Sequence, residues 1–368
     1  MIFDQPSSDL ISSILYDTID VYFKTKFSHN IVSYAVKGGK RTRGRMYLES
    51  LYACIEYFLI SGHIPDQKTA RTIARKFTPA CAVVELIHEA SLIIDDCPFM
   101  DNSELRRERD SCFVKFGVAE CQLVSLEIIL KAGAILKDIV GENFEVVKRF
   151  NKMGQQFGIN AESIVADGIS IGQIMDIRLN KITDRSVVGD TAFSDLLVPP
   201  PTSKDDELLP RFDYKILVQE CAPSTSVNLS INSSLLSTYL KMVELKTSKL
   251  FTISTCLPIM LTTCSTYLIG VEEKNINELI LHNYTLSNFF GIAFQLIDDV
   301  EDEFHSDEEI PANNLNYYLN RNESTELITG IIERCFCTDK ESMRFIPYKF
   351  KRVMEHKLET ALTSHCDN

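Results

Sequence analysis

Two adjacent carboxylates at the end of an apolar stretch are the first residues in this sequence that could do chemistry. In SLIIDDCPFMDNSELRR, residues 91–107, Asp95 and Asp96 follow three aliphatic residues, and Asp101 comes after a proline. Pro98 cannot continue a helix, because it lacks an amide hydrogen and its ring collides with a preceding carbonyl group. We therefore expect a helix to break there and Asp101 to turn back toward the aspartate pair.

A second run of aspartates repeats this pattern. In FQLIDDVEDEF, residues 294–304, Asp298 and Asp302 lie four residues apart and share one face of a helix, with Asp299 beside them. Like charges at this spacing destabilise a bare helix, so we expect a cation nearby. Several carboxylate oxygens suit Mg²⁺, which usually shares its coordination between carboxylates, water and a substrate phosphate. A solvated acidic face is the alternative for either run alone, but the repetition favours a magnesium site.

A basic, glycine-containing segment could bind phosphate. The sequence VKGGKRTRGR, residues 36–45, carries five cations, and its two glycines let the backbone approach a ligand closely. The cations are Lys37, Lys40, Arg41, Arg43 and Arg45. Just beyond the first acidic run, Arg106 and Arg107 add two planar guanidinium groups suited to diphosphate oxygens. The spacing is not that of a nucleotide P-loop, and a solvated basic stretch is the alternative for residues 36–45.

The elements that must position these groups are helices. Apolar residues recur at intervals of three and four in four stretches, at 10–23, 77–94, 119–140 and 285–304. No hairpin dipeptide lies between alternating strands, so the sequence predicts an all-α protein. We expect one domain over residues 1–368. At about 178–236, clustered Pro, Ser, Asp and Asn predict a partly disordered surface insertion.

Composition limits the class of protein. A chain of 368 residues that is 45% hydrophobic can bury a large core. Its net charge of −13 argues against nucleic acid as the main partner. Eleven cysteines without CxxC pairs indicate reduced thiols rather than a disulfide framework. The sequence has no uncharged apolar run of ~18 residues, no secretion signal and no transit peptide, so we expect a cytoplasmic protein without stable membrane insertion.

Taken in order, these motifs resemble the trans-isoprenyl diphosphate synthases, the polyprenyl synthetase family that includes farnesyl and geranylgeranyl diphosphate synthases. The resemblance rests on GGKRxR, H-x6-DDxxxxD-x4-RR, GQxxD, KTxxLF and FQxxDDxxD, which together span about residues 33–305. The extended first acidic motif is most similar to geranylgeranyl-type enzymes. The resemblance implies an isoprenoid synthase fold, with long helices around a deep central cavity, the two acidic motifs facing each other across it, and a homodimer.

The resemblance also implies roles for individual residues. Mg²⁺ would be held at the allylic diphosphate by Asp95, Asp96, Asp101, Asp298, Asp299 and Asp302. The allylic site would be completed by Arg106, Lys246, Thr247 and Gln295, of which the last three would also be catalytic. Isopentenyl diphosphate would bind Lys40, Arg43, His88 and Arg107. Without the resemblance, His88 on an apolar helix is more typical of a buried core histidine.

The implied reaction is a head-to-tail condensation. Loss of diphosphate from the allylic substrate leaves a carbocation, which the double bond of isopentenyl diphosphate attacks while water is excluded. The cation formed by this attack then loses a proton to give the elongated allylic diphosphate. In the family, a bulky aromatic residue four or five positions before the first aspartate limits chain growth. Here those positions hold the small residues Ser91 and Ala90. We therefore expect a C20 geranylgeranyl product, with C15 farnesyl diphosphate as the alternative.

The sequence departs from the family pattern near both diphosphates. After the arginine pair the family usually reads G-x-P-T, whereas residues 108–111 read ERDS. After the second acidic motif a lysine is usual, whereas residues 310–315 read IPANNL, and Arg321 is the nearest candidate to replace it. A second hypothesis is therefore a catalytically weakened regulatory or binding subunit of a prenyl diphosphate synthase. A terpene cyclase is a third, disfavoured because it needs no second-substrate site. Retention of all six aspartates favours the active enzyme.

Overall fold

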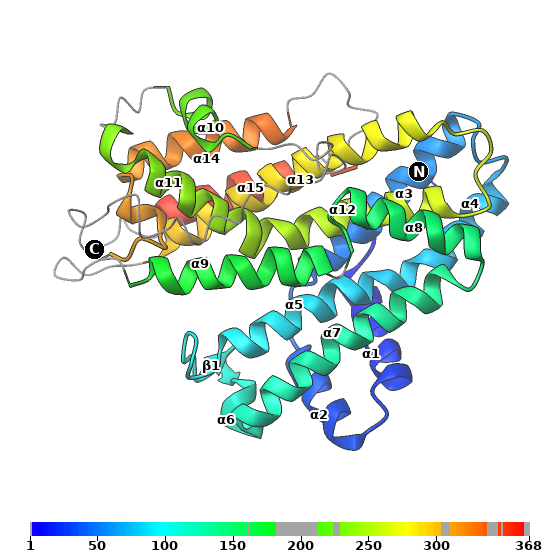
Figure 1. The fold of residues 1–368 in the computed structure, drawn as a ribbon, viewed down its shortest axis with the longest axis horizontal. Helices are drawn as coiled ribbons and strands as arrows, with labels where there is room; N and C mark the ends of the chain where they lie inside the picture. The colour runs from blue at the N-terminus through cyan, green and yellow to red at the C-terminus, as the bar shows by residue number, and fades with distance from the viewer. Residues whose placement is uncertain are drawn as a thin grey trace. The chain divides into compact units, whose positions relative to one another are not determined.

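The computed structural model describes residues 2–160, 162–181, 212–223, 229–302, 310–336, 345–346 and 349–363. Within these ranges the chain forms helices and one short hairpin (Figure 1). The prediction of an all-α protein is therefore confirmed. The four stretches with helical periodicity fall on helices, although the last of these helices begins at Glu273, earlier than the sequence pattern indicated.

The chain divides into two compact units. The first comprises Met1–Gln155, Ile159–Ala161 and Ile253–Ile280, and the second comprises Gln156–Gly158, Glu162–Thr252 and Leu281–Asn368. Of the described helices, α8 Phe144–Gln156, α12 Lys249–Cys264 and α13 Glu273–Glu301 contribute residues to both. The expectation of one domain over residues 1–368 stays a prediction.

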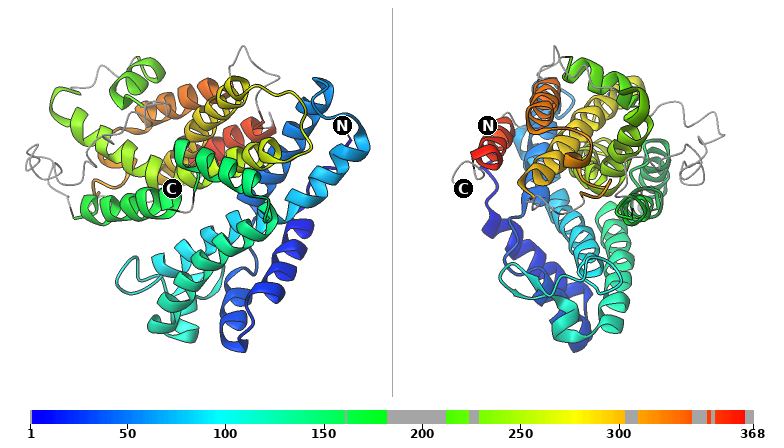
Figure 2. Two further views of the ribbon diagram at one scale, coloured as in Figure 1. Left: turned by 45° about the vertical axis from the view of Figure 1, so that its right-hand side comes forward. Right: turned by 90° about the vertical axis from the view of Figure 1, so that its left-hand side faces the viewer.

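The first unit is organised around helix α5. The unit includes parts of α12 and α13. The bounds of its elements that lie before α9 in the chain are α1 Ser8–Tyr22, α2 Lys26–Ala35, α3 Thr42–Ile60, α4 Gln67–Phe77, η1 Thr78–Ala80, α5 Cys81–Asp95, β1 Leu105–Arg106, β2 Arg109–Asp110, α6 Cys112–Phe116, α7 Val118–Val140 and α8 Phe144–Gln156. Helix α5 contacts α1, α3 and α7, and both views in Figure 2 show α5 and α7 side by side. Most of its residues are buried, so α5 is a core helix, and the first acidic motif lies at its C-terminal end.

Among the described residues, one helical stretch, Gln67–Asp95, is long and apolar enough to cross a membrane by length and composition. Two thirds of its apolar window, 67%, is buried inside the structure, as in the core helix of a soluble protein. This stretch is weak evidence for a membrane span, and the absence of stable membrane insertion stays a prediction.

The second unit carries the second acidic motif at the end of α13. The bounds of its elements, including those shared with the first unit, are η2 Glu162–Ser170, α9 Ile171–Leu179, α10 Tyr214–Cys221, α11 Leu229–Val243, η4 Glu244–Ser248, α12 Lys249–Cys264, α13 Glu273–Glu301, η5 Leu315–Tyr317, α14 Arg321–Phe336 and α15 Lys349–Thr363. The η4 segment is π-helical, a widened turn that is often found at functional sites. It packs closely on α9, because a Cβ atom on Gly172 would lie 2.4 Å from the backbone nitrogen of Lys246.

The expected insertion at about 178–236 is described only in part. Its described residues include the end of α9, all of α10 and the first part of α11. Residues 182–211 and 224–228 lie outside the described residues.

Candidate active site

The first acidic motif forms a turn that folds back on the end of α5. Asp95 is the last residue of the helix, and Pro98 follows in the turn. The amide of Asp101 donates a hydrogen bond to the carbonyl oxygen of Asp95 at 2.9 Å, and the amide of Ser103 donates to that of Asp96 at 3.0 Å. The predicted break of the helix and the return of Asp101 are therefore confirmed.

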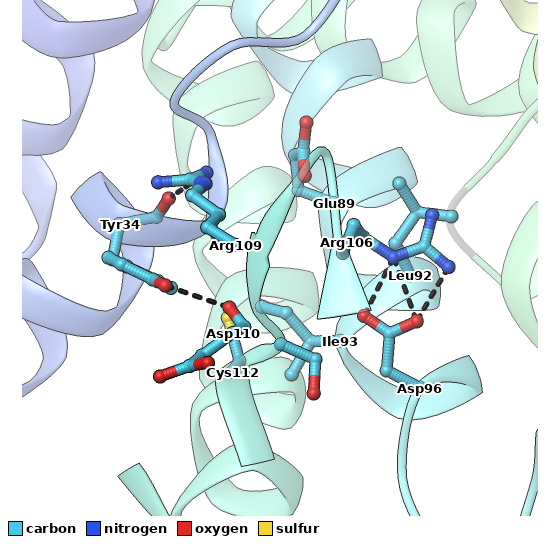
Figure 3. A pocket seen from close by; sticks show the side chains of 11 residues that line it. Tyr34, Glu89, Leu92, Ile93, Asp96, Arg106, Arg109, Asp110 and Cys112 are labelled. Carbon is cyan, nitrogen blue, oxygen red and sulfur yellow. Dashed lines mark hydrogen bonds and ion pairs between the residues drawn. The ribbon is translucent and has the colours of Figure 1, made fainter. Parts of the chain in front are cut away.

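Asp96 is buried against Arg106, which reaches it from strand β1 (Figure 3). The Nε atom of Arg106 lies 2.8 and 2.7 Å from the two carboxylate oxygens, and Nη2 lies 2.6 Å from Oδ1. The side chain of Asp96 is 2% exposed, so this forked ion pair satisfies a carboxylate that water cannot reach. The pair lines a pocket together with Leu92, Ile93 and Cys112. Both residues were predicted to bind the allylic diphosphate and its metal, and that role stays a prediction.

Arg107 is engaged by protein groups on the other side of the hairpin. Its Nη2 donates to Oε1 of Glu89 at 2.8 Å, and its Nη1 donates to the carbonyl oxygen of Ala35 at 2.9 Å. Burial raises the pKa of Glu89, and the positive charge of Arg107 partly opposes this shift. A Cβ atom on Gly39 would lie 2.7 Å from Nη1 of Arg41 and 3.3 Å from Nη2 of Arg107, so a side chain there would displace these guanidinium groups. To bind diphosphate, Arg107 would have to exchange Glu89 for the ligand.

The hairpin turn explains one departure from the family pattern. Strands β1 and β2 pair Arg106 with Arg109, which leaves Arg107 and Glu108 as a two-residue loop. Both loop residues have positive φ, 54° and 61°, the signature of a type I′ turn that favours glycine. Glu108 is the first residue of ERDS and stands where the resembled family has glycine. The chain therefore places a side chain on a backbone that disfavours one.

Replacement of Glu108 by glycine should stabilise the protein. The change removes a left-handed non-glycine residue, which costs about 1–2 kcal/mol, and we expect part of this as a gain of about 1 kcal/mol in the free energy of unfolding. Urea denaturation of the wild type and Glu108→Gly measures it. Glu104→Gly, at an exposed position without positive φ, is the control and should give no gain. A lower stability of Glu108→Gly would contradict the assigned turn.

Of the residues predicted to bind isopentenyl diphosphate, Arg43 and His88 are in contact. Nη1 of Arg43 lies 3.0 Å from Nε2 of His88. Burial, and then the positive charge of Arg43, lower the pKa of His88 well below its ordinary value, so the ring is neutral and Nε2 accepts the hydrogen bond. Lys40 is exposed in the loop before α3. Arg41 from the same basic segment is buried instead. Its Nη1 lies 3.5 Å from Oε2 of Glu85 and 3.6 Å from Oε1 of Glu89, and these ion pairs hold the loop on α5.

The neutral state of His88 has a consequence for stability. Because its pKa is lower in the folded than in the unfolded chain, the unfolded chain binds the extra proton as pH falls below about 6.5, and stability is lost. His88→Gln keeps an acceptor for Arg43 without this titration. We expect the loss of unfolding free energy between pH 7 and 5 to be smaller in His88→Gln, by up to about 1.4 kcal/mol per pH unit. His29→Gln controls for loss of an imidazole, and equal pH slopes in wild type and His88→Gln would contradict a neutral His88.

The second acidic motif also buries its middle carboxylate. Asp299 is 4% exposed and accepts hydrogen bonds from the hydroxyl of Tyr239, from Nε2 of Gln295 at 2.8 Å and from the amide of Leu315 at 2.9 Å. Burial raises the pKa of Asp299 to about 7, and these hydrogen bonds oppose the shift. Like Asp96, Asp299 is therefore a buried carboxylate whose oxygens are bound by protein donors.

The outer carboxylates of this motif are more accessible. Asp298 is 41% exposed and forms an ion pair with Lys357. Asp302 accepts a hydrogen bond from Nδ2 of Asn314 at 2.8 Å. Partial burial and then the negative charge of Asp298 raise the pKa of Asp302. The repulsion expected from the sequence is therefore present between these two carboxylates.

Of the three residues predicted to be catalytic, Gln295 and Thr247 are linked to this motif by hydrogen bonds, and Lys246 contacts Asp176. The hydroxyl of Thr247 donates to Oε1 of Gln295 at 2.8 Å, and Gln295 in turn donates to Asp299. Nζ of Lys246 lies 2.5 Å from Oδ2 of Asp176, the aspartate of the GQxxD motif. The π-helical turn η4 thus presents Lys246 and Thr247 to α9 and α13, and a chain of hydrogen bonds fixes the amide of Gln295.

Several residues of this site were missed in the sequence. IPANNL was noted only for lacking a lysine, but its two asparagines bind acidic groups: Asn313 donates to Asp176 at 2.9 Å, and Asn314 donates to Asp302. Asparagines in a turn segment were an available signal. Nothing in the sequence pointed to Tyr239 or Lys357. Arg321, considered as a replacement for the lysine, instead donates to carbonyl groups in the last turn of α15.

The six predicted metal ligands fall in two units. Those of the first motif lie in the first unit and those of the second motif in the second, so their meeting across a cavity stays a prediction. In the part of the chain that the structure describes, no three His, Cys, Asp or Glu side chains form a group that could hold a metal.

Comparison with known proteins identifies the N-terminal half. Residues 25–190 match the family model described as polyprenyl synthetase. Over these residues the chain is similar to the polyprenyl synthetase family. The match includes the basic segment, His88 and the first acidic motif, and the second acidic motif lies beyond it. The resemblance stated from the sequence is confirmed.

Similar proteins are prenyltransferases. The chain is 35% identical over 100 residues to a trans-prenyltransferase of African swine fever virus, covering 27% of this chain and 28% of that protein. It is 36% identical over 101 residues to a geranylgeranyl diphosphate synthase of Pseudescherichia vulneris, covering 27% and 30%. The alignments thus span less than a third of either relative.

Two solved structures share the fold of this chain. A geranyltranstransferase of Thermotoga maritima has a TM-score of 0.57 at 17% identity, covering 95% of this chain and 97% of that one. An isoprenoid synthase family member of Thermotoga neapolitana has a TM-score of 0.55 at 18% identity, covering 94% and 99%. The isoprenoid synthase fold is therefore confirmed over most of the chain, while its deep central cavity stays a prediction.

Proposed function

We propose that this protein is a magnesium-dependent prenyltransferase, which joins isopentenyl diphosphate head to tail to an allylic diphosphate. The observation that carries the proposal is the hydrogen-bonded chain of Thr247, Gln295 and Asp299, beside the outer carboxylates Asp298 and Asp302. It occurs in a chain with the isoprenoid synthase fold and a polyprenyl synthetase segment. The product would be geranylgeranyl diphosphate, with farnesyl diphosphate as the alternative.

The outer carboxylates fit magnesium. Asp298 and Asp302 are hard oxygen donors that repel each other, which contributes to the raised pKa of Asp302, and a divalent cation would relieve that repulsion. Asp95 and Asp101 would hold metal at the first motif, while Asp96 and Asp299 would act mainly by positioning. When bound, magnesium would neutralise diphosphate charge and make the diphosphate a better leaving group.

The chain's own residues would orient the reacting groups. Gln295 is fixed at both ends of its amide, so the oxygen of Thr247 and the amide dipole are held near the second motif without reorganisation. Lys246 would offer its ammonium to the diphosphate, exchanging part of its contact with Asp176. On the isopentenyl side, Arg43 and Lys40 would bind diphosphate, with neutral His88 holding Arg43 in place.

The proposal extends to the cellular compartment. Nine cysteines in the described residues are buried and form no disulfide: Cys54, Cys81, Cys97, Cys112, Cys121, Cys221, Cys256, Cys264 and Cys335. Cysteines without disulfides are typical of a reducing compartment, which supports a cytoplasmic location.

Elongation assays test the proposed reaction. We expect purified protein with Mg²⁺ and labelled isopentenyl diphosphate to elongate an allylic primer to C20 or C15. Asp298→Ala and Asp95→Ala should each lower kcat/KM by roughly 1,000-fold, because metal binding to the diphosphate contributes several kcal/mol. Circular dichroism should show unchanged helicity, and Asp17→Ala on α1 is the control. Absence of elongation with every primer would refute the enzyme and support the alternative of a binding subunit.

A second copy of the chain is the partner we propose. Helix α7 exposes Leu123, Leu126 and Leu130 by 69%, 56% and 68%. Spacings of three and four residues place them on one helix face, and an apolar stripe of this kind is suited to an isologous contact with its own copy.

Charge on this stripe should abolish the homodimer. We expect wild-type protein to elute as a dimer in size-exclusion chromatography with light scattering, and Leu126→Lys to be monomeric, because a lysine would be buried without a partner. Ile60→Lys, at a position 86% exposed at the end of α3, is the matched control and should stay dimeric. A dimeric Leu126→Lys protein would show that this face is not the interface.

A further inference from the structure

Lys357 on α15 lies directly on the second acidic motif. Its ammonium forms an ion pair with Asp298 and lies 3.5 Å from Oε2 of Glu301 and 4.8 Å from the centre of the Phe294 ring. These three residues are spaced by four and three along α13, so they form one face of its last turns. The side chain of Lys357 is 21% exposed, which strengthens its attraction to carboxylates relative to a fully solvated pair.

The backbone that carries Lys357 is anchored. Helix α15 buries one side of itself, formed by Phe350, Met354, Leu358 and Ala361. The ring of Phe350 packs edge-on against Phe290 of α13 at 5.8 Å between centroids. Arg321 binds the carbonyl groups of Ala361 and Leu362 in the last turn of α15. The lysine side chain can therefore change partners while the helix stays in place.

The other aspartates of the motif are bound by neutral donors. Asp299 accepts from Tyr239 and Gln295, and Asp302 accepts from Asn314. Among the described residues, Lys357 is thus the cation that forms an ion pair with Asp298. Its single positive charge offsets the repulsion between Asp298 and Asp302.

We propose that Lys357 is a built-in counter-ion of the second acidic motif, holding Asp298 in the metal-free protein and being displaced when a divalent cation binds there. This role rests on the proposed function, because it takes Asp298 as a metal ligand. A divalent cation on Asp298 would repel the ammonium at a few ångströms. The flexible four-carbon stem of lysine lets the ammonium move away without a change in α15.

Metal titration of matched variants tests this competition. In isothermal titration with Mn²⁺ alone, Lys357→Met should bind about tenfold more tightly than wild type, because a competing unit charge is removed at short range. The methionine keeps an apolar contact with Phe294. Lys357→Arg keeps the charge and should bind as wild type does. Lys351→Met, on the same helix and paired with Glu355 at 3.6 Å, should also leave affinity unchanged.

Chemical labelling gives a second readout that needs no turnover. Adding Mg²⁺ to wild-type protein should raise the rate at which an amine-reactive ester acylates Lys357 several-fold, followed by mass spectrometry, while the rate at Lys351 stays constant. An unchanged or slower rate at Lys357 would overturn its displacement by metal.

The outcomes separate this inference from the proposed function. If wild-type protein elongates prenyl diphosphates but Lys357→Met binds Mn²⁺ with equal or lower affinity, the counter-ion role is wrong and the enzyme stands. If neither protein binds Mn²⁺ and wild type elongates no primer, both proposals fail.

Discussion

Burial of the middle aspartate in each acidic motif is the constraint on which the rest of the site depends. A buried carboxylate without partners is strongly unfavourable, so Asp96 requires the fork of Arg106, and Asp299 requires Tyr239, Gln295 and a backbone amide. Each set of partners comes from a different segment of the chain, which fixes those segments on the helix end. The outer aspartates are then left at the surface of the motif, where they can meet a ligand. We therefore propose different roles for the two adjacent carboxylates at the end of each apolar helix.

The same constraint connects stability with function. The hairpin that delivers Arg106 also delivers Arg107 to Glu89, and its two-residue turn holds both loop residues at positive φ. The side-chain amide of Gln295 donates a hydrogen bond to Asp299 through its nitrogen and accepts one from the hydroxyl of Thr247 through its oxygen. Groups proposed for substrate binding are therefore held by carboxylates that do not need to bind metal themselves. Substrate would replace some of these contacts, such as that between Lys246 and Asp176, rather than order a disorganised site.

Local rules predicted the helices, the break after Asp95 and the return of Asp101, because Pro98 and apolar periodicity act within a few residues. The ordered motifs indicated the family over residues 25–190 and the fold. The hairpin was missed because Arg107 and Glu108 are not the residues that favour a type I′ turn. The partners of Asp298 and Asp299 were missed because Lys357 and Tyr239 lie about sixty residues away in the chain, where no local pattern marks them. Position in space, not residue type, makes these two side chains part of the site.

The division of each motif into a buried anchor and accessible ligands is tested most directly by locating the metal. Crystals grown with Mn²⁺ and inorganic diphosphate would show the ions by anomalous scattering. We predict Mn²⁺ at about 2.1 Å from carboxylate oxygens of Asp95 or Asp101 and of Asp298 or Asp302, with Asp96 still on Arg106 and Asp299 still on Tyr239. Manganese bound by Asp96 or Asp299 in place of those partners, or no manganese at either motif, would contradict this account.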